Sequence, residues 1–297
     1  MKASCRLTTA AALCLPVLLL SGCMFSTRKL LIPKAPLVTQ TVSADVLVSR
    51  LNDRWTKLES LTAKVEIQAS VLKTKEGKAT DFTTINGRIV MRKPGQLRVV
   101  GLTPIVNAHI FDMASDGKTF TLLNQIQNKA IRGPNTLRKR SASQFENLRP
   151  KVFFDAMVVR GLEPDDEYMV TAETVMLEDT AKKHLFSVPE YLLSVMRRKP
   201  GGQELTPVRV VRFHRDDLLP YQQDSYDSEG NLETQVTYEN YQDFDSNQYP
   251  SRITIKRPLE ELQLVMTVDK ESENLKNMTD EQFQVKVPEG TPVQELE

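Results

Sequence analysis

Cys23 is the residue whose surroundings most clearly predict covalent chemistry. It follows Leu20-Ser21-Gly22, an apolar residue and two small ones that leave the backbone open to a peptidase. Lys2 and Arg6 stand before an apolar run from about Leu7 to Leu20, which is the layout of an export signal and is too short for a membrane-spanning helix. We therefore expect residues 1–22 to be a cleaved signal peptide.

Leu20-Ser21-Gly22-Cys23 resembles the lipobox of bacterial lipoproteins. The resemblance implies that Cys23 carries fatty acyl chains such as palmitate, which hold the protein to a membrane. Two or three such chains, at about 0.8 kcal/mol for each buried CH₂, make a permanent tether. The alternative is an ordinary cleaved signal that is followed by a cysteine by chance.

The three histidines form no catalytic or metal-binding pattern. His109, His184 and His214 are far apart, and none has the spacing of known metal-ligand motifs. Asp216 and Asp217 follow His214, but two aspartates where a strand enters a turn are ordinary turn residues. No nucleophile elbow, phosphate-binding loop or dinucleotide fingerprint is present. We therefore predict a protein that is not an enzyme and needs no cofactor or metal.

Composition limits the class of protein further. Removing 22 residues from the 297 leaves 275, with 37 basic and 38 acidic residues, so the net charge of −1 does not favour nucleic acid binding. Because Cys5 and Cys14 lie in the signal, the mature chain keeps one cysteine and must be stabilised by core burial. Beyond the signal no apolar run approaches 18 residues, so we expect the body to be tethered only by its lipid.

The chain after the signal begins with a spacer and a helix. Residues 23–41 contain two prolines and no periodicity, which predicts a flexible tether before a single domain over 42–297. An apolar stripe with helical spacing follows, and Ser43 is a suitable N-cap. The stripe consists of Val42, Leu47, Leu51, Trp55 and Leu58.

Period-two patterning dominates the rest and predicts a mainly β fold with a few helices (α+β). Pro150–Arg160 reads as a second helix that ends at Gly161. The strands predict a large curved antiparallel sheet, an open or half β-barrel, with helices covering its concave apolar face. The predicted strands are 65–71, 81–92, 97–101, 108–114, 119–123, 168–177, 185–197, 208–214, 220–226, 232–241, 249–256 and 262–270. The candidates for the concave face are Ile67, Ile89, Met91, Val99, Phe111, Val210 and Val265.

Three stretches of the chain resemble the lipoprotein-carrier superfamily, the LolA/LolB-like fold. They are Trp55 with Leu58–Ile67; Arg92–Arg98 with Pro104 and Ser115–Lys118; and Tyr241 with Tyr249–Ile253, Pro258, Leu262–Val268, Thr279–Phe283 and Val287-Pro288. The resemblance implies an open β-barrel with a helix-covered apolar cavity. Residues 135–205 are additional to typical members, and their role is left open.

The membrane-anchored members of this superfamily accept lipoproteins from a soluble carrier, and Cys23 matches that kind. The resemblance implies three partners: the membrane, an acyl chain or a lipoprotein's lipid moiety, and a periplasmic carrier protein. Met24 follows Cys23 and no aspartate stands there, which favours an outer-membrane anchor facing the periplasm. Leu102, Pro104, Ile105 and Val106 match the family's membrane or cargo loop, with a buried strand end as the alternative. An envelope sensor or protein-interaction module is the second candidate function, and an envelope enzyme is the third.

Overall fold

The computed structural model describes residues 39–73, 76–137, 139–141, 143–179, 184–199, 201–244, 247–275 and 277–297. The chain forms two compact units. One consists of Met1–Leu37 and Thr174–Val188, of which the described part is the ends of two strands. The other consists of Val38–Glu173 and Pro189–Glu297 and carries all the other elements.

The first helix, α1 (Ala44–Lys57), has the features that the sequence predicts. The Ser43 side chain accepts a hydrogen bond from the backbone N–H of Val46, and Asp45 lies in the first turn, where a negative charge stabilises a helix. Its buried residues belong to a core cluster with side chains of two strands, within 184–198 and 205–214, and of the turn that follows the second. The members of this cluster are Leu47, Val48, Leu51, Tyr191, Leu193, Val195, Val211, Phe213 and Leu218.

The strands form one open sheet of 15 strands. In chain order they are β1 (Ser60–Lys73), β2 (Lys78–Asp81), β3 (Ile85–Arg92), β4 (Gln96–Leu102), β5 (His109–Ser115), β6 (Thr119–Asn124), β7 (Lys129–Pro134), β8 (Asp166–Asp179), β9 (His184–Arg198), β10 (Leu205–His214), β11 (Pro220–Tyr226), β12 (Leu232–Phe244), β13 (Asn247–Arg257), β14 (Leu262–Glu273) and β15 (Val293–Glu295). Short 3₁₀ turns lie at Gln144–Asn147, Pro258–Glu260 and Asp280–Phe283.

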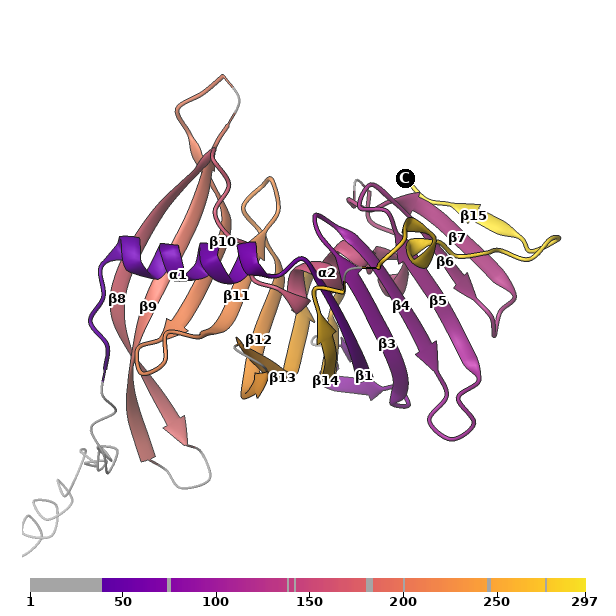
Figure 1. Cartoon of the computed structure of the whole chain (residues 1–297), viewed down its shortest axis with the longest axis horizontal. Coiled ribbons are helices and arrows are strands. Elements are labelled where there is room, and N and C mark those ends of the chain that lie inside the picture. Colours follow the sequence, from indigo (N-terminus) through magenta and orange to yellow (C-terminus); the bar gives the residue numbers. More distant parts are fainter. Residues whose placement is uncertain are drawn as a thin grey trace, which may run out of the picture. The chain divides into compact units, whose positions relative to one another are not determined.

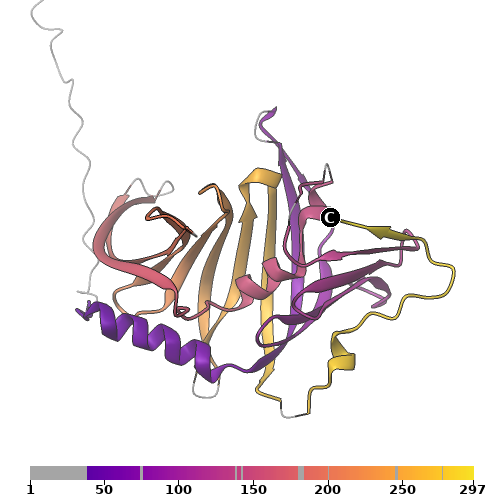
Figure 2. The ribbon, with the colours of Figure 1, turned by 90° about the horizontal axis from the view of Figure 1, so that it is seen from above.

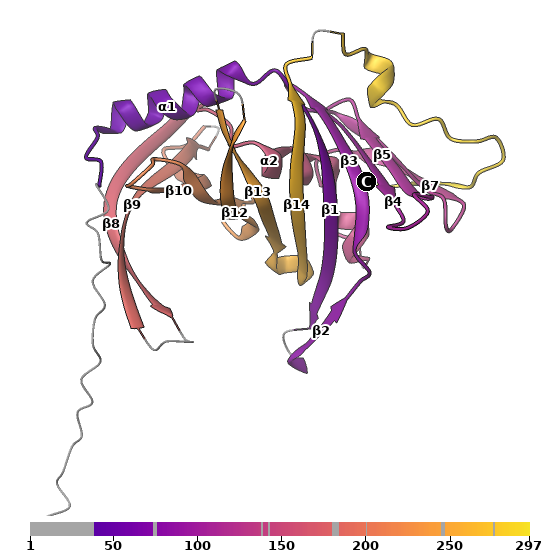
Figure 3. The same ribbon diagram turned by 60° about the horizontal axis from the view of Figure 1, so that its bottom comes forward.

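The order of strands follows the chain except that β1 lies between β14 and β3 and also pairs with β2, and that β15 lies next to β7 (Figure 3). This arrangement confirms the predicted mainly β fold with an open sheet. Three details differ from the prediction, and the first is that β7 and β15 are not among the predicted strands. The sheet is mixed, because β15 pairs with β7 in parallel, and the predicted strand 81–92 is split between β2 and β3.

Cross-strand pairing shows which side chains share a face, because directly paired residues point the same way. Ile89 pairs with Val99 and Ala63, and Ile255 pairs with Leu264 and Val236. These fully or nearly fully buried residues define what we call the inner face. Five of the seven predicted positions lie on it.

Val210 and Val265 are the exceptions, and their assignment was wrong. Val210 pairs with Asp224 and Val265 with Thr254, so both point to the outer face and are half-buried. On each strand the neighbouring residues, Val211 and Met266, take the inner face instead. A shift of one residue exchanges the two faces of a strand, and apolar residues stand at both positions here.

The second helix, α2 (Pro150–Met157), lies against the inner face and contacts β4, β5 and β13 (Figure 2). Pro150 occupies its first turn, as predicted. The predicted end at Gly161 was wrong, because Val158 is already extended. Both helices lie on the same face, since the strand residues that α1 packs against pair in register with inner-face residues (Figure 1).

Gly161 is a point of close approach to α1 and not a helix cap. A Cβ atom at this position would lie 2.8 Å from Asn52 Oδ1 and 2.9 Å from Trp55 Cδ1. The next residue, Leu162, donates its backbone N–H to Asn52 Oδ1 at 2.9 Å and thereby holds the segment against the helix.

Gly161→Ala should therefore lower the free energy of unfolding by about 1–3 kcal/mol, because a methyl group is forced into a filled space. Thermal or urea unfolding measures the change. The control is Gly202→Ala, whose Cβ would find no atom closer than 3.9 Å and whose effect should stay within about 0.5 kcal/mol. Equal effects of the two variants would contradict the close approach.

Candidate ligand-binding site

Helix α2 occupies the apolar part of the inner face. Phe153, Phe154 and Met157 are at most 4% exposed and belong to the same core cluster as β1, β3, β4, β13 and β14. Four residues from this cluster, Met91, Val99, Ile253 and Met266, are fully buried. The side chains of α2 therefore fill the space where the sequence predicts an apolar cavity.

A small apolar hollow remains between α1, α2 and the strands β12 and β13. Its volume is about 70 Å³, and Trp55, Met157, Tyr238 and Tyr249 are among its lining residues. A cavity that holds benzene has about 150 Å³, so this hollow is too small for an acyl chain. Burial raises the pKa of the Tyr238 phenol well above its usual value.

A larger and strongly charged hollow of about 520 Å³ lies on the other side of α2. It is lined by α2 and the segment after it, by parts of the preceding segment 135–149, and by residues of β8 to β13. The cations in its lining are Arg149, Lys151, Arg160, Arg197, Arg209 and Arg257. The acids are Asp155, Glu163, Asp166, Asp227 and Glu233.

Asp155 organises the charges at the C-terminal end of α2. Its carboxylate accepts hydrogen bonds from Lys151 Nζ and, at 2.6 Å, from Arg160 Nε. Burial raises the pKa of Asp155, but the two cations lower it by more, so the pKa lies below its usual value. The carboxylate is therefore charged at neutral pH.

Arg197 is the third paired cation of this end of the hollow. Its Nη2 lies 2.6 Å from Asp166 Oδ1 and 2.8 Å from Glu163 Oε2. The hydrogen bond to Asp166 raises the pKa of the guanidinium. Lys151, Arg160 and Arg197 thus each have a carboxylate partner.

Arg209 has no carboxylate partner among the described residues. Its side chain donates to the backbone carbonyls of Arg160 at 2.7 Å and Gly161 at 2.6 Å, and the residue is 7% exposed. Burial lowers the pKa of this guanidinium, while the charges of Asp166 and Asp155 act in the opposite direction. A buried cation bound only to carbonyl groups is unusual, because buried charges are normally paired.

Three side chains of the hollow have buried polar atoms without a hydrogen-bond partner, and one of them is Arg197, through its Nε. Gln223, which is 3% exposed, donates from Nε2 to the carbonyl of Asp155 at 3.2 Å, but its Oε1 accepts nothing. Arg149, also 3% exposed, stacks over the Phe120 ring at 5.0 Å, and its Nε and Nη1 have no partner. Such atoms are rare in folded proteins and indicate a missing partner.

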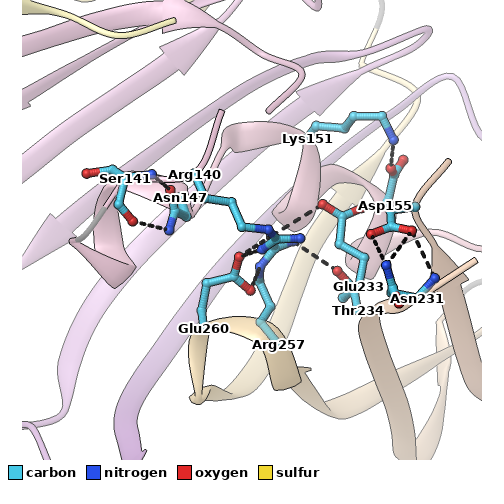
Figure 4. A network of polar contacts seen from close by, with 11 residues as sticks. Arg140, Ser141, Asn147, Lys151, Asp155, Asn231, Glu233, Thr234, Arg257 and Glu260 are labelled. Carbon is cyan, nitrogen blue, oxygen red and sulfur yellow. Dashed lines mark hydrogen bonds and ion pairs between the residues drawn. The ribbon is translucent and has the colours of Figure 1, made fainter. Parts of the chain in front are cut away.

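Arg257, which also lines the hollow, forms a buried ion cluster (Figure 4). Its Nε lies 3.2 Å from Glu260 Oε2, and both side chains are at most 2% exposed. Nη1 donates to Thr234 Oγ1 at 3.0 Å and Nη2 lies 3.4 Å from Glu233 Oε1, while Arg140 also pairs with Glu260. This cluster fixes the 3₁₀ turn after β13 to the sheet.

The predicted lipidation site and the predicted loop differ in what the structure describes of them. Cys23 lies outside the described residues. Leu102 is the half-buried last residue of β4, and Pro104 is exposed in the loop that follows. Ile105 and Val106 are 91% and 74% exposed, so the alternative of a buried strand end does not hold for them.

The candidate acid–base residues do not form a site. His109 is exposed at the start of β5, and nothing is described of the His184 side chain. His214 stacks on Tyr221 with 4.2 Å between ring centroids. Asp216 and Asp217 accept hydrogen bonds from backbone N–H groups of the turn, as expected of turn residues.

Within the described part of the chain, no group of three or more His, Cys, Asp or Glu side chains could hold a metal ion. In the same part, no helix is both long and apolar enough to cross a membrane.

Sequence reasoning did not find Arg209 and Gln223. On β10, Arg209, Val211 and Phe213 stand two residues apart and share the inner face. Arg209 is therefore a charged residue in an otherwise apolar series. A charged residue at such a position is the signal that could have identified it. Gln223 carries no comparable signal, because β11 has no clear alternation.

Comparison with known proteins shows the fold and no close relative. No family model and no curated protein matches the sequence. A LolA superfamily protein from Nitrosomonas europaea is 14% identical with a TM-score of 0.51, covering 82% of this chain and 99% of its own. A DUF1329 family protein from Desulfovibrio piger is 15% identical with a TM-score of 0.51, covering 80% and 95%. The expected resemblance is thus confirmed at the level of structure. The chain has the fold of the LolA superfamily.

Proposed function

We propose that this chain is a lipid-anchored protein of the bacterial envelope, held by an acylated Cys23, that binds an acyl chain or a lipoprotein's lipid moiety reversibly on its inner face. The role is non-enzymatic. The single observation that carries the proposal is that α2 occupies the apolar face of an open sheet with the carrier fold. The helix occupies the space that a ligand would take, so it must move when a ligand binds.

The energetics suit reversible exchange. An acyl chain with about 14 methylenes gains on the order of 11 kcal/mol on burial, at about 0.8 kcal/mol for each CH₂. Exposing the three large apolar side chains of α2 costs about 5–9 kcal/mol, at about 1.5–3 kcal/mol for each. The net gain is a few kcal/mol, which permits both loading and release. An eight-residue helix has little stability of its own, so it can leave the sheet without a large further cost.

The exposed loop after β4 supports a membrane- or cargo-facing role for one edge of the sheet. Ile126, in the turn between β6 and β7, is 73% exposed and lies at the same edge as Ile105 and Val106. The turn between β6 and β7 lies beside the loop after β4, because Gln125 N donates a hydrogen bond to Ile110 O, near the start of β5, at 2.9 Å. Exposed branched apolar side chains at a loop tip are suited to enter a bilayer or an apolar partner. We assign the loop to the delivery step and an outer-membrane location to the anchor.

The test measures binding of a fluorescent fatty acid by the full chain with Cys23→Ala. Phe154→Ala weakens the packing of α2 and should raise the affinity for the probe by about tenfold, since less energy is needed to displace the helix. The matched control is Leu193→Ala, which opens an equally buried position in the cluster beneath α1 and should leave the affinity unchanged. No saturable binding by either variant or by the parent would sink the proposal.

The same assay separates the loop from the cavity. When the probe is delivered from vesicles, Ile105→Ser with Val106→Ser should slow transfer several-fold without changing the equilibrium affinity. If the protein instead captures unfolded polypeptide and no lipid, the chain is an interaction or sensor module.

A further inference from the structure

The charged hollow beside α2 has an uncompensated positive charge at one end. Lys151, Arg160, Arg197 and Arg209 face three acids there, and only Arg209 has no carboxylate partner among the described residues. A guanidinium has five N–H donors, of which Arg209 uses two on the carbonyls of Arg160 and Gly161. A group with a single negative charge would complete this arrangement.

The partner must also offer a hydrogen-bond donor. Gln223 lines the same hollow and is only 3% exposed, and its Oε1 is a buried acceptor without a donor. A fatty acid carboxylate has no donor to satisfy it. A phosphodiester esterified to glycerol has one negative charge on phosphate and a hydroxyl donor a few bonds away.

The size of the hollow agrees with such a head group. Its volume of about 520 Å³ corresponds to roughly 17 water molecules at about 30 Å³ each, which is far more than one carboxylate needs. The position agrees as well. Val152, Asp155 and Ala156 of α2 line the hollow, while Phe153 and Phe154 lie in the core cluster on the inner face. A lipid could therefore place its chain beneath α2 and its head group in the hollow.

We propose that the hollow between α2 and strands β10–β13 binds the phosphodiester head group of an anionic glycerophospholipid, with Arg209 as the ligand of the phosphate and Gln223 as the acceptor from the head-group alcohol. This inference rests on the proposed function, because it names the class of lipid whose acyl chain the inner face takes. The inference also connects binding of the head group with movement of α2. A phosphate at Arg209 lies beside the carbonyls of Arg160 and Gly161, to which the same guanidinium donates just beyond the end of α2.

The experiment compares two short lipids that differ only in the head group, dihexanoyl phosphatidylglycerol and dihexanoylglycerol, using calorimetry on the full chain with Cys23→Ala. The parent should bind the phospholipid at least tenfold more tightly, as a charge-assisted hydrogen bond predicts. Arg209→Gln should remove this preference and keep the affinity for the uncharged lipid. Arg252→Gln is the matched control, because Arg252 points to the outer face, is 46% exposed and pairs with Glu239.

The outcomes separate the two proposals. Equal affinity of the parent for both lipids overturns the head-group site and leaves the proposed function standing. Binding of neither lipid overturns the proposed function. In that case, glycerophosphoglycerol or inorganic phosphate serves as the probe, and Arg209-dependent ³¹P broadening would support a phosphate site that acts without an acyl chain. If Arg209→Gln does not fold, Arg209→Lys takes its place, since it keeps the charge but loses the paired donors and should reduce the preference several-fold.

Discussion

Phe154→Ala should lower the free energy of unfolding by about 3–5 kcal/mol, the range for removing a large buried aromatic side chain. Phe154 is 1% exposed, and the Arg160 guanidinium lies 5.0 Å from its ring centroid. The loss of stability has two parts. One is the transfer free energy of the ring, and the other is the cost of the cavity left beneath α2, which is too short to close over it. Urea unfolding followed by fluorescence or circular dichroism gives the value.

Phe82→Ala is the matched control for this change. Phe82 is 43% exposed and makes an edge-to-face contact with Phe145 at 5.3 Å, so its loss should cost only about 1 kcal/mol. A cost near 1 kcal/mol for Phe154→Ala would show that the space beneath α2 collapses freely or that the helix does not hold the inner face. The exchange of α2 for a ligand would then need another physical basis.

Arg257→Met should destabilise the protein by about 3–5 kcal/mol, because it leaves the buried Glu260 carboxylate short of its main partner. Glu260 has 1% of its side chain exposed and keeps only Arg140, which is 38% exposed. Replacing both members, as in Arg257→Met with Glu260→Leu, should recover most of the loss, since an apolar pair of similar volume needs no compensation. Equilibrium unfolding of the two variants measures the difference.

The control for the ion cluster is Arg252→Met on the same strand. Arg252 points to the outer face, is 46% exposed and pairs with Glu239 at 3.2 Å, so its replacement should change the free energy of unfolding by at most about 1 kcal/mol. Recovery in the double variant distinguishes an unpaired charge from lost packing. A double variant as unstable as Arg257→Met would show that packing, not charge, is the origin of the effect.

Phe154→Ala and Arg257→Met test two different parts of the inner face. Phe154 belongs to its apolar part, which the proposed acyl chain would share with α2. Arg257 belongs to the polar part, where the charged hollow lies. A lipid has the same division between chain and head group, and this correspondence is the physical basis of the proposed function and of the further inference.

The sequence alone determined the elements whose signal is local. Ser43 and the apolar stripe after it specified α1, and the alternation of Val65 and Ile67 with Lys64 and Glu66 specified β1. Turn residues separated most strands correctly, because each hairpin needs only its own few residues. β7 and β15 were missed. β7 ends in Gly133-Pro134, and three-residue β15 exists only because a distant segment pairs with it.

The tertiary structure decided the features that depend on several segments at once. Pairing register, and not the apolar character of Val210 and Val265, settled which side chains face inward, since both faces of those strands carry valine. α2 ends at Met157, and the segment after it approaches α1 at Gly161, a contact that no pattern within residues 150–161 can express. The charged hollow brings Asp155, Arg197, Arg209 and Gln223 together from α2, β9, β10 and β11. Period and turn chemistry act over a few residues, whereas burial and electrostatic compensation depend on neighbours that only the folded chain supplies.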